Sequence, residues 1–313
     1  MELRQFRYFL SIVDCGSLSR ASQQLFIAQS ALSKQIADLE DELGVQLLHR
    51  NRSGVVPTEA GKTFYDHAQS VLRLVNGTKA AVQAAAEAVS GSIVVALPQS
   101  MAAMLAMPLM RAAKARYPQV ILHLNEELTG NMVEQMIRGQ VDVAMFTDAP
   151  LPDEFEFTPV LEEDFYLLHA ADDEQAPPLG DVTIEVALAR PLVYPSHAHS
   201  HSTRAIVENA VQAGGLSMIS MAAEVNSVHA LISVVEAGIG PTIMPLGVAL
   251  REIEDGRLVA HRILCKGMSR TIGVCVSSHV PLTNTKKALS SLLLEVSREL
   301  CTSGKWPGTT LVS

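Results

Sequence analysis

The feature that most constrains the fold of this chain is a succession of three short helical patterns within its first 44 residues. Apolar side chains recur at helical spacing over residues 3–13 and predict a first amphipathic helix. Gly16 interrupts that pattern, and Ser17 is of the residue type that caps the start of a second, short helix. A third helix is predicted over residues 29–43, with Leu32, Ile36, Leu39 and Leu43 facing inward. The sequence therefore predicts a compact bundle of three helices.

The outer face of the third helix changes character along its length. Its N-terminal half carries small, polar or cationic residues, whereas its C-terminal half carries Asp38, Asp41 and Glu42. A helix of this polarity fits the major groove of DNA by its N-terminal half, because the positive end of its dipole then lies near phosphates and the carboxylates point away. The polar residues of that half are Gln29, Ser30, Ser33 and Lys34.

Two short strands are predicted after the third helix, at residues 47–50 and 55–57. The turn between them displays Arg52 at its tip, where a wing reaches the adjacent minor groove. The pattern predicts a winged helix-turn-helix that binds double-stranded DNA, although an ordinary three-helix bundle with a surface hairpin has the same periodicity. The residues predicted to contact DNA are Ser17, Gln29, Ser30, Ser33, Lys34, Arg50, Arg52 and Thr58.

The sequence of this segment closely resembles that of the LysR-type transcriptional regulators. The matching runs are residues 16–25 (GSLSRASQQL), 28–33 (AQSALS), 36–40 (IADLE), 43–44 (LG), 47–50 (LLHR) and 57–61 (PTEAG). Three positions depart from the family pattern. The family often has Ala at the position of Ser22, often has Ser or Thr at the position of Ala28, and usually has Phe at the position of Leu48. Because Ala28 has no capping oxygen, Gln29 or Ser30 is expected to cap the third helix instead.

A long helix is predicted from Thr58, a suitable N-cap, to about residue 89. Its narrow apolar stripe favours pairing with a second copy of the chain over burial in a single core. The resemblance implies a homodimer formed through this helix, which assembles further as a dimer of dimers on dyad-symmetric promoter DNA. The stripe consists of Phe64, Ala68, Val71, Val75 and Val82.

Strand and helix patterns alternate after residue 90 and predict an α/β architecture with parallel sheets. The expected strands are 92–97, 120–126, 141–146, 165–170, 192–195, 218–225, 241–244, 258–264 and 271–277. The expected helices are 101–116, 129–138, 202–213, 227–237 and 284–301. The resemblance implies two subdomains like those of periplasmic solute-binding proteins, and a family segment matches at 238–245 (GIGPTIMP). The predicted domains are 1–58 for DNA binding, 59–89 for the linker and 90–313 for regulation, with subdomain 1 at about 90–162 and 266–303 and subdomain 2 at about 163–265.

An effector site is expected in the cleft between the two subdomains, where strands of this architecture end. Hydroxyl groups and free helix N-termini at the positions that match the family suit a small anion, although capping alone explains the same residues. The candidate ligand-binding residues are Ser100, Met101, Thr129, Thr147, Ser202 and Thr203. The methionine stripe Met101, Met104, Met107 and Met110 is expected to pack in the core.

The sequence contains none of the common enzyme motifs, so we expect no catalytic activity and no cofactor. His123, His169 and His229 are expected to be isolated structural histidines. Residues 197, 199 and 201 form an alternating histidine run that is read as a solvated loop, with a metal site as the less favoured alternative. The four cysteines have no paired spacing that would indicate a disulfide framework or zinc.

The net charge of −9 is compatible with a DNA partner, because the acidic excess lies after residue 88, where 24 Asp and Glu residues outnumber 15 Lys and Arg. No apolar stretch reaches membrane-spanning length, and the first residues do not read as a signal peptide. We therefore expect a cytoplasmic protein with no membrane partner. The segment after residue 299 is expected to be loosely ordered.

Scattered matches resemble one subgroup of the family, the nitrogen assimilation control regulators. They are residues 13–18, 67–68 and 311–313. This resemblance implies control of nitrogen-assimilation genes, with RNA polymerase as a further partner. The alternatives are a LysR-type regulator of another metabolic pathway and, in a different class, a small-molecule-binding α/β protein without a gene-regulatory role.

Overall fold

A computed structural model describes residues 1–51, 54–83, 89–148, 151, 153, 155–195, 203–216, 220–277 and 283–312 of the chain. The chain divides into two compact units. One consists of Met1–Ala86 with Ile137–Gln140, and the other of Glu87–Met136 with Val141–Ser313. In the part of the chain that the structure describes, no helix is both long enough and apolar enough to span a bilayer.

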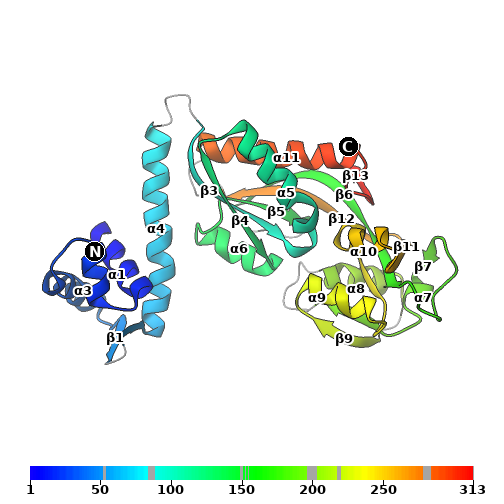
Figure 1. Ribbon diagram of the computed structural model, residues 1–313, viewed down its shortest axis with the longest axis horizontal. Helices are drawn as coiled ribbons and strands as arrows, with labels where there is room; N and C mark the ends of the chain where they lie inside the picture. The colour runs from blue at the N-terminus through cyan, green and yellow to red at the C-terminus, as the bar shows by residue number, and fades with distance from the viewer. Residues whose placement is uncertain are drawn as a thin grey trace. The chain divides into compact units, whose positions relative to one another are not determined.

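The first unit contains helices, a two-stranded hairpin and a long helix (Figure 1). The elements are α1 (Leu3–Cys15), α2 (Leu18–Gln24), α3 (Gln29–Leu43), β1 (Leu48–Asn51), β2 (Gly54–Pro57) and α4 (Glu59–Gln83). The predicted inward face of α3 is confirmed, because Leu32, Ile36 and Leu39 are fully buried. Phe64 of α4 packs edge-on against Phe9, with ring centroids 5.0 Å apart. The start of the long helix therefore belongs to the core of the three-helix bundle.

Glycines allow the hairpin to lie close to the helices. Gly16 ends α1 with a left-handed backbone (φ 59°), and Gly44 ends α3 in the same way (φ 68°). A Cβ atom at Gly54 would lie 2.6 Å from the Gly16 carbonyl oxygen, so a larger residue would separate the hairpin from the end of α1. The same carbonyl accepts a hydrogen bond from the backbone N–H of Val55 at 3.0 Å.

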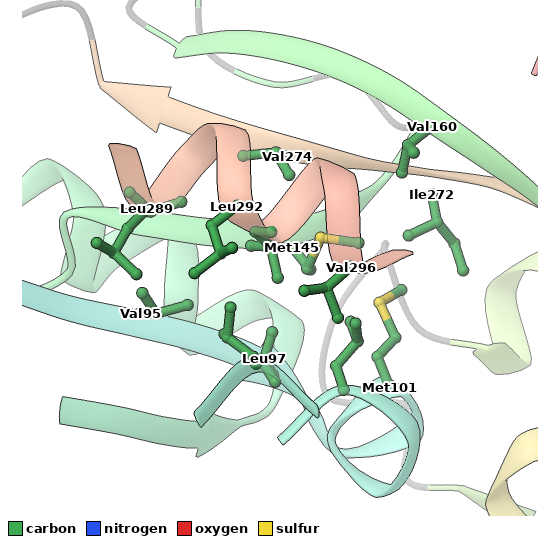
Figure 2. Close-up of a cluster of buried hydrophobic side chains, with 14 of the residues drawn as sticks. Val95, Leu97, Met101, Met145, Val160, Ile272, Val274, Leu289, Leu292 and Val296 are labelled. Atoms are coloured by element: carbon green, nitrogen blue, oxygen red, sulfur yellow. The ribbon is translucent and has the colours of Figure 1, made fainter. Parts of the chain in front are cut away.

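The first subdomain of the second unit is built on three parallel strands, β3 (Gly91–Pro98), β4 (Val120–Glu127) and β5 (Val143–Thr147). The connecting helices are α5 (Gln99–Arg116) and α6 (Thr129–Ile137). Strand β12 (Ser269–Ser277) pairs antiparallel with β5, and α11 (Asn284–Thr302) packs with α5 on one face of the sheet. Figure 2 shows the buried core between these elements, which includes Val95, Leu97, Met145, Val274, Leu289 and Leu292.

In its described residues, the second subdomain combines short strands with short helices. Its strands are β7 (Val182–Thr183), β8 (Leu192–Pro195), β9 (Met221–Val225), β10 (Thr242–Pro245) and β11 (Leu258–Leu264), and β8 and β9 form a separate parallel pair. Its helices are α7 (Ile184–Ala187), α8 (Thr203–Ala213), α9 (Val228–Glu236) and α10 (Leu250–Glu254), with a 3-10 turn η1 at Leu246–Ala249. Two buried clusters form its core, one around Phe165, Val207 and Ile243 and one around Leu168, Leu231 and Val235.

Strand β6 (Phe155–Ala170) belongs to both subdomains, and it corrects two expectations from the sequence. Its first part pairs with β12 and its last part with β10 and β11, all antiparallel, so one mixed sheet runs in the order β4-β3-β5-β12-β6-β11-β7. The prediction of parallel sheets therefore holds among the described strands for β3, β4 and β5, for β8 with β9 and for β7 with β11, but not for β6. The predicted strand at 165–170 is only the end of β6. Its earlier part carries Pro159 and consecutive acidic residues, which hide the alternation of a strand.

The segment after residue 299 is ordered, so the expectation of a loose end was wrong. Helix α11 reaches Thr302, and β13 (Thr309–Leu311) pairs antiparallel with β6 at Leu161–Glu163. Trp306 is only 1% exposed and lies in the core of the first subdomain. Burial of this indole ring supplies the apolar contact that orders the segment. The mostly polar residues around Trp306 give no sign of that contact in the sequence.

The methionine stripe of α5 is only partly core. Met101 is fully buried and Met104 packs against the same cluster, whereas Met107 and Met110 are 58% and 43% exposed. The expectation that all four pack inside was therefore wrong for the last two. At a spacing of three residues, successive side chains rotate about the helix axis, so all four methionines cannot lie on the one buried face of α5.

Candidate nucleic-acid interface and effector site

The predicted DNA-contacting face of α3 is exposed in the first unit. Gln29, Ser30 and Lys34 are exposed, and Ser33 is half-buried on the same side of the helix. Among the described residues no side chain caps the start of α3, so the expectation that Gln29 or Ser30 provides a cap was wrong. Both side chains and the first backbone N–H groups of α3 therefore remain available to an anion such as a DNA phosphate.

Two of the predicted contacts have structural roles of their own. The Ser17 hydroxyl accepts a hydrogen bond from the backbone N–H of Arg20 at 3.4 Å, which confirms its prediction as an N-cap. The Thr58 hydroxyl donates to the Gln46 carbonyl at 2.8 Å and accepts from the Gly61 backbone N–H at 2.9 Å. Thr58 thus fixes the start of α4 to the end of the segment before β1.

Ser33 and Arg50 are brought together by the fold. Arg50 lies on β1, and its Nη1 donates a hydrogen bond to the Ser33 Oγ on α3 at 2.9 Å. This hydrogen bond connects the β1–β2 hairpin to α3, the helix predicted to enter the major groove. Arg52, the predicted wing tip, lies outside the described residues, so its role stays a prediction.

One carboxylate in the acidic half of α3, that of Glu40, has a structural role within the unit. The Glu40 carboxylate accepts hydrogen bonds from the backbone N–H groups of Leu47 and Leu48, at 2.7 and 3.0 Å. This carboxylate therefore holds the loop into β1, away from the exposed Gln29 face. In the same unit, burial and a hydrogen bond to Asp14 raise the pKa of Tyr65 on α4 to about 12.

Three of the predicted effector residues lie at one edge of the first subdomain's sheet. Because β3, β4 and β5 are parallel, their carboxyl ends bring the first residues of α5 and α6 and the end of β5 to the same edge. The residues there are Ser100, Thr129 and Thr147; Ser100 and Thr147 are buried. Met101 points instead into the core, near Val296 and Ile272 (Figure 2), and offers no surface to a ligand in this conformation.

The remaining effector candidates belong to the second subdomain. Thr203 is a buried residue at the first position of α8, and Ser202 lies outside the described residues. The two subdomains touch near this edge, because Gln99 Oε1 accepts a hydrogen bond from the backbone N–H of Val228 at 3.2 Å. Beside α8, the Arg204 guanidinium lies 5.4 Å from the centre of the Tyr194 ring, and burial raises the pKa of that tyrosine.

A buried polar network that the sequence did not reveal adjoins Ser100. Glu163 of β6 is fully buried, and its Oε2 lies 2.6 Å from Nη2 and 2.7 Å from Nε of Arg270. Arg270 Nη2 also donates to the Ser100 Oγ at 3.0 Å, and Trp306 Nε1 donates to Glu163 Oε1 at 2.8 Å. The network joins residues that are up to 206 positions apart in the chain, so no local pattern predicts it.

His169 is not an isolated histidine, which corrects the expectation from the sequence. His169 and His261 are buried and stacked, and their Nε2 atoms lie 2.9 Å apart. The partner comes from β11, too far along the chain for spacing to indicate it. His123 and His229 are exposed. Residues 197, 199 and 201 lie outside the described residues; among those described, no three His, Cys, Asp or Glu side chains gather as metal ligands would.

These features define a class of protein: a winged helix-turn-helix followed by a two-subdomain α/β regulatory unit. Residues 3–62 match the family "Bacterial regulatory helix-turn-helix protein, lysR family", and residues 86–298 match the "LysR substrate binding domain". The chain belongs to the LysR family of DNA-binding transcriptional regulators. The matches indicate a regulator of transcription and not an enzyme.

Similar proteins have the same organisation along nearly the whole chain. The nitrogen assimilation regulatory protein nac of Klebsiella aerogenes is 32% identical over 297 residues, and that of Escherichia coli is 30% identical; each match covers 95% of both chains. Among solved structures, CbnR complexed with its target DNA superposes with a TM-score of 0.72 at 22% identity, covering 96% of this chain and 99% of that one. Full-length OxyR from Pseudomonas aeruginosa gives a TM-score of 0.70 at 21% identity, covering 95% of each. These structures confirm the predicted fold.

Proposed function

We propose that this regulator controls nitrogen-assimilation genes by binding dyad-symmetric promoter sites as a dimer of dimers in the cytoplasm. The observation that carries the DNA-binding part is the exposed, uncapped and polar N-terminal face of α3. The nitrogen role is supported by two relatives that are named nitrogen assimilation regulatory proteins and match 95% of the chain. The proposed division is 1–58 for DNA binding, 59–89 for the linker and dimerisation and 90–313 for effector binding and regulation, with RNA polymerase as a further proposed partner of the protein.

Mapping of the protein on genomic DNA under nitrogen-rich and nitrogen-poor growth tests this proposal. We expect discrete positions that share a dyad and lie beside nitrogen-utilisation genes. Discrete positions beside other genes would contradict the nitrogen role and leave a LysR-type regulator of another pathway. A complete lack of positions would favour a small-molecule-binding protein without a gene-regulatory role.

The proposed DNA contacts are Ser17, Gln29, Ser30, Ser33, Lys34, Arg50, Arg52 and Thr58. Lys34→Glu is expected to abolish specific binding, because it places a carboxylate on the exposed face that meets the negatively charged groove. Lys287→Glu is the matched control, since it makes the same charge change on an exposed position of α11. Affinity measured by fluorescence anisotropy on a mapped site distinguishes the two; equal affinities of both variants would remove Lys34 from the interface.

The proposed effector is a small anion in the cleft between the subdomains, contacted by Ser100, Thr129, Thr147, Ser202 and Thr203. The position of three of these residues at the carboxyl edge of parallel strands supports this site. A screen of small carboxylates and phosphates by thermal shift tests it: a compound that stabilises the wild-type protein is expected to lose its effect in Thr147→Val. An equal effect in both proteins would place the compound elsewhere.

A further inference from the structure

Ser33 and Arg50 link α3, the proposed recognition helix, to the β1–β2 hairpin, the predicted wing. Ser33 is half-buried in the second turn of α3, and Arg50 is exposed on β1. Their side chains are joined by the 2.9 Å hydrogen bond from Arg50 Nη1 to Ser33 Oγ. The backbone below them is fixed as well, because Arg50 pairs with Val55, whose N–H is bonded to the Gly16 carbonyl.

The guanidinium group of Arg50 keeps most of its binding capacity in this arrangement. An arginine has five N–H donors, and the bond to Ser33 uses one of them. Among the described residues, no carboxylate lies within ion-pair distance of Arg50, so its charge is available to an incoming anion. The hydroxyl of Ser33 accepts from Arg50 and therefore still has its own proton to donate.

The guanidinium fork of an arginine binds either a phosphate or the edge of a guanine, and the position of Arg50 on β1, outside α3, favours the phosphate. Arginine binds phosphate through two parallel N–H groups, and restricting its rotation lowers the entropy lost in forming them. The hydroxyl of a serine that accepts from this arginine lies beside the same fork and is able to donate to the same phosphate.

We propose that Ser33 acts as a positioning residue for Arg50, and that the two side chains together bind one backbone phosphate at the base of the wing. The inference rests on the proposed placement of α3 in the major groove, because that placement brings β1 to the edge of the groove. Ser33 therefore contributes to affinity for any duplex and not to the choice among sequences.

A double-mutant cycle on a mixed-sequence DNA duplex tests this proposal. Binding of the full-length wild type, Ser33→Ala, Arg50→Ala and the double variant is measured by anisotropy over a range of salt concentrations. Each single variant is expected to lower the slope of log affinity against log salt by about one per bound chain. The double variant is expected to have the salt slope of Arg50→Ala, because Ser33 carries no charge of its own and has nothing to position once the arginine is absent.

Two further variants separate positioning from other roles. Ser33→Thr keeps the hydroxyl and is expected to restore the wild-type salt slope. Ser30→Ala removes an exposed hydroxyl one turn earlier, and its effect is expected to add to that of Arg50→Ala. Circular dichroism spectra and melting temperatures confirm that each variant is folded.

Three results would overturn the proposal. Additive effects of Ser33→Ala and Arg50→Ala would show that the two side chains act separately. An unchanged salt slope together with altered preference among duplexes would make Ser33 a base-reading residue. Wild-type protein that binds no duplex, while remaining folded, would instead overturn the proposed placement of α3 on which this inference rests.

Discussion

Single buried residues set the most local properties of this protein, and Cys275 is the clearest case. Its side chain on β12 is fully buried, and this burial raises the pKa of the thiol to about 12, an effect that the nearby Lys286 ammonium only partly offsets. A thiol with a raised pKa in the folded state is protonated there while the unfolded chain already ionises. Folding thus favours the neutral thiol.

The stability of the second unit is therefore expected to fall as pH rises above the ordinary thiol pKa of 9.0 toward 12. The loss from this group amounts to about 1.4 kcal/mol by about pH 10. Urea unfolding of wild type and Cys275→Ala between about pH 8 and about pH 10 measures it. Lys286 is present in both proteins, so the variant is the control; parallel pH profiles would contradict the expected thiol effect.

At the residue scale, the sequence predicted features that depend on one residue and its near neighbours. Ser17 as a cap and Gly16 and Gly44 as helix ends follow from residue type alone. Pairs such as His169 with His261 join separate strands, and their spacing in the sequence carries no information about contact. Prediction of the candidate site was limited in the same way, because the partner of Ser100 is Arg270.

Among the elements, β6 and the segment that follows α11 determine how the two subdomains meet. Trp306 and Gly308 lie in the turn before β13, and a Cβ at Gly308 would come within 2.9 Å of the Tyr166 ring. Trp306 also lies beside Gly247 of η1, from the second subdomain. This segment, beyond the residues 86–298 that match the family, thus contacts both subdomains at the place where β6 passes between them.

Trp306→Phe is expected to destabilise the protein by about 1–3 kcal/mol, because Glu163 Oε1 loses its donor while the ring stays buried. Trp306→Ala is expected to cost about 3–5 kcal/mol, since a cavity is added to that loss. Urea unfolding followed by circular dichroism measures both, because Trp306 is the only tryptophan and its fluorescence is lost. Lys305→Ala, at the exposed neighbour, is the control; equal stability of Trp306→Phe and wild type would show that the indole N–H contributes nothing.

Elements with strong periodicity were predicted well, and elements that depend on distant partners were not. The helices α1, α3 and α11 have apolar stripes that require one buried face, so their bounds follow closely from the sequence. The first part of β6 is interrupted by Pro159 and by consecutive acidic residues, and β13 is only three residues long. Both become strands because β12 and β6 supply their hydrogen-bond partners.

Assembly of the whole molecule depends in our proposal on α4, which offers the surface for the proposed dimer. Val71 and Leu74 are 36% and 44% exposed on this helix, beyond Phe64, which packs against the three-helix core. Exposed apolar side chains on a long helix typically become buried when two such helices pair.

Val71→Asp is therefore expected to shift the protein from dimers or tetramers to monomers, because pairing would bury two carboxylates in an apolar seam. Sedimentation velocity measures the change directly. Gln69→Asp introduces the same side chain on the opposite side of the helix and is the control. A Val71→Asp protein that sediments as the wild type does would rule out pairing through this stripe.

The placement of β6 also has a consequence for how the protein is made. All its partner strands follow it in the chain: β10, β11 and β12 begin at residues 242, 258 and 269, and β13 ends at 311. On a translating ribosome, the central strand of the regulatory unit therefore waits unpaired, whereas α1 to β2 of the DNA-binding unit are complete by residue 57. The DNA-binding unit is ready to fold early, and the sheet of the regulatory unit is complete only when β13 has been synthesised.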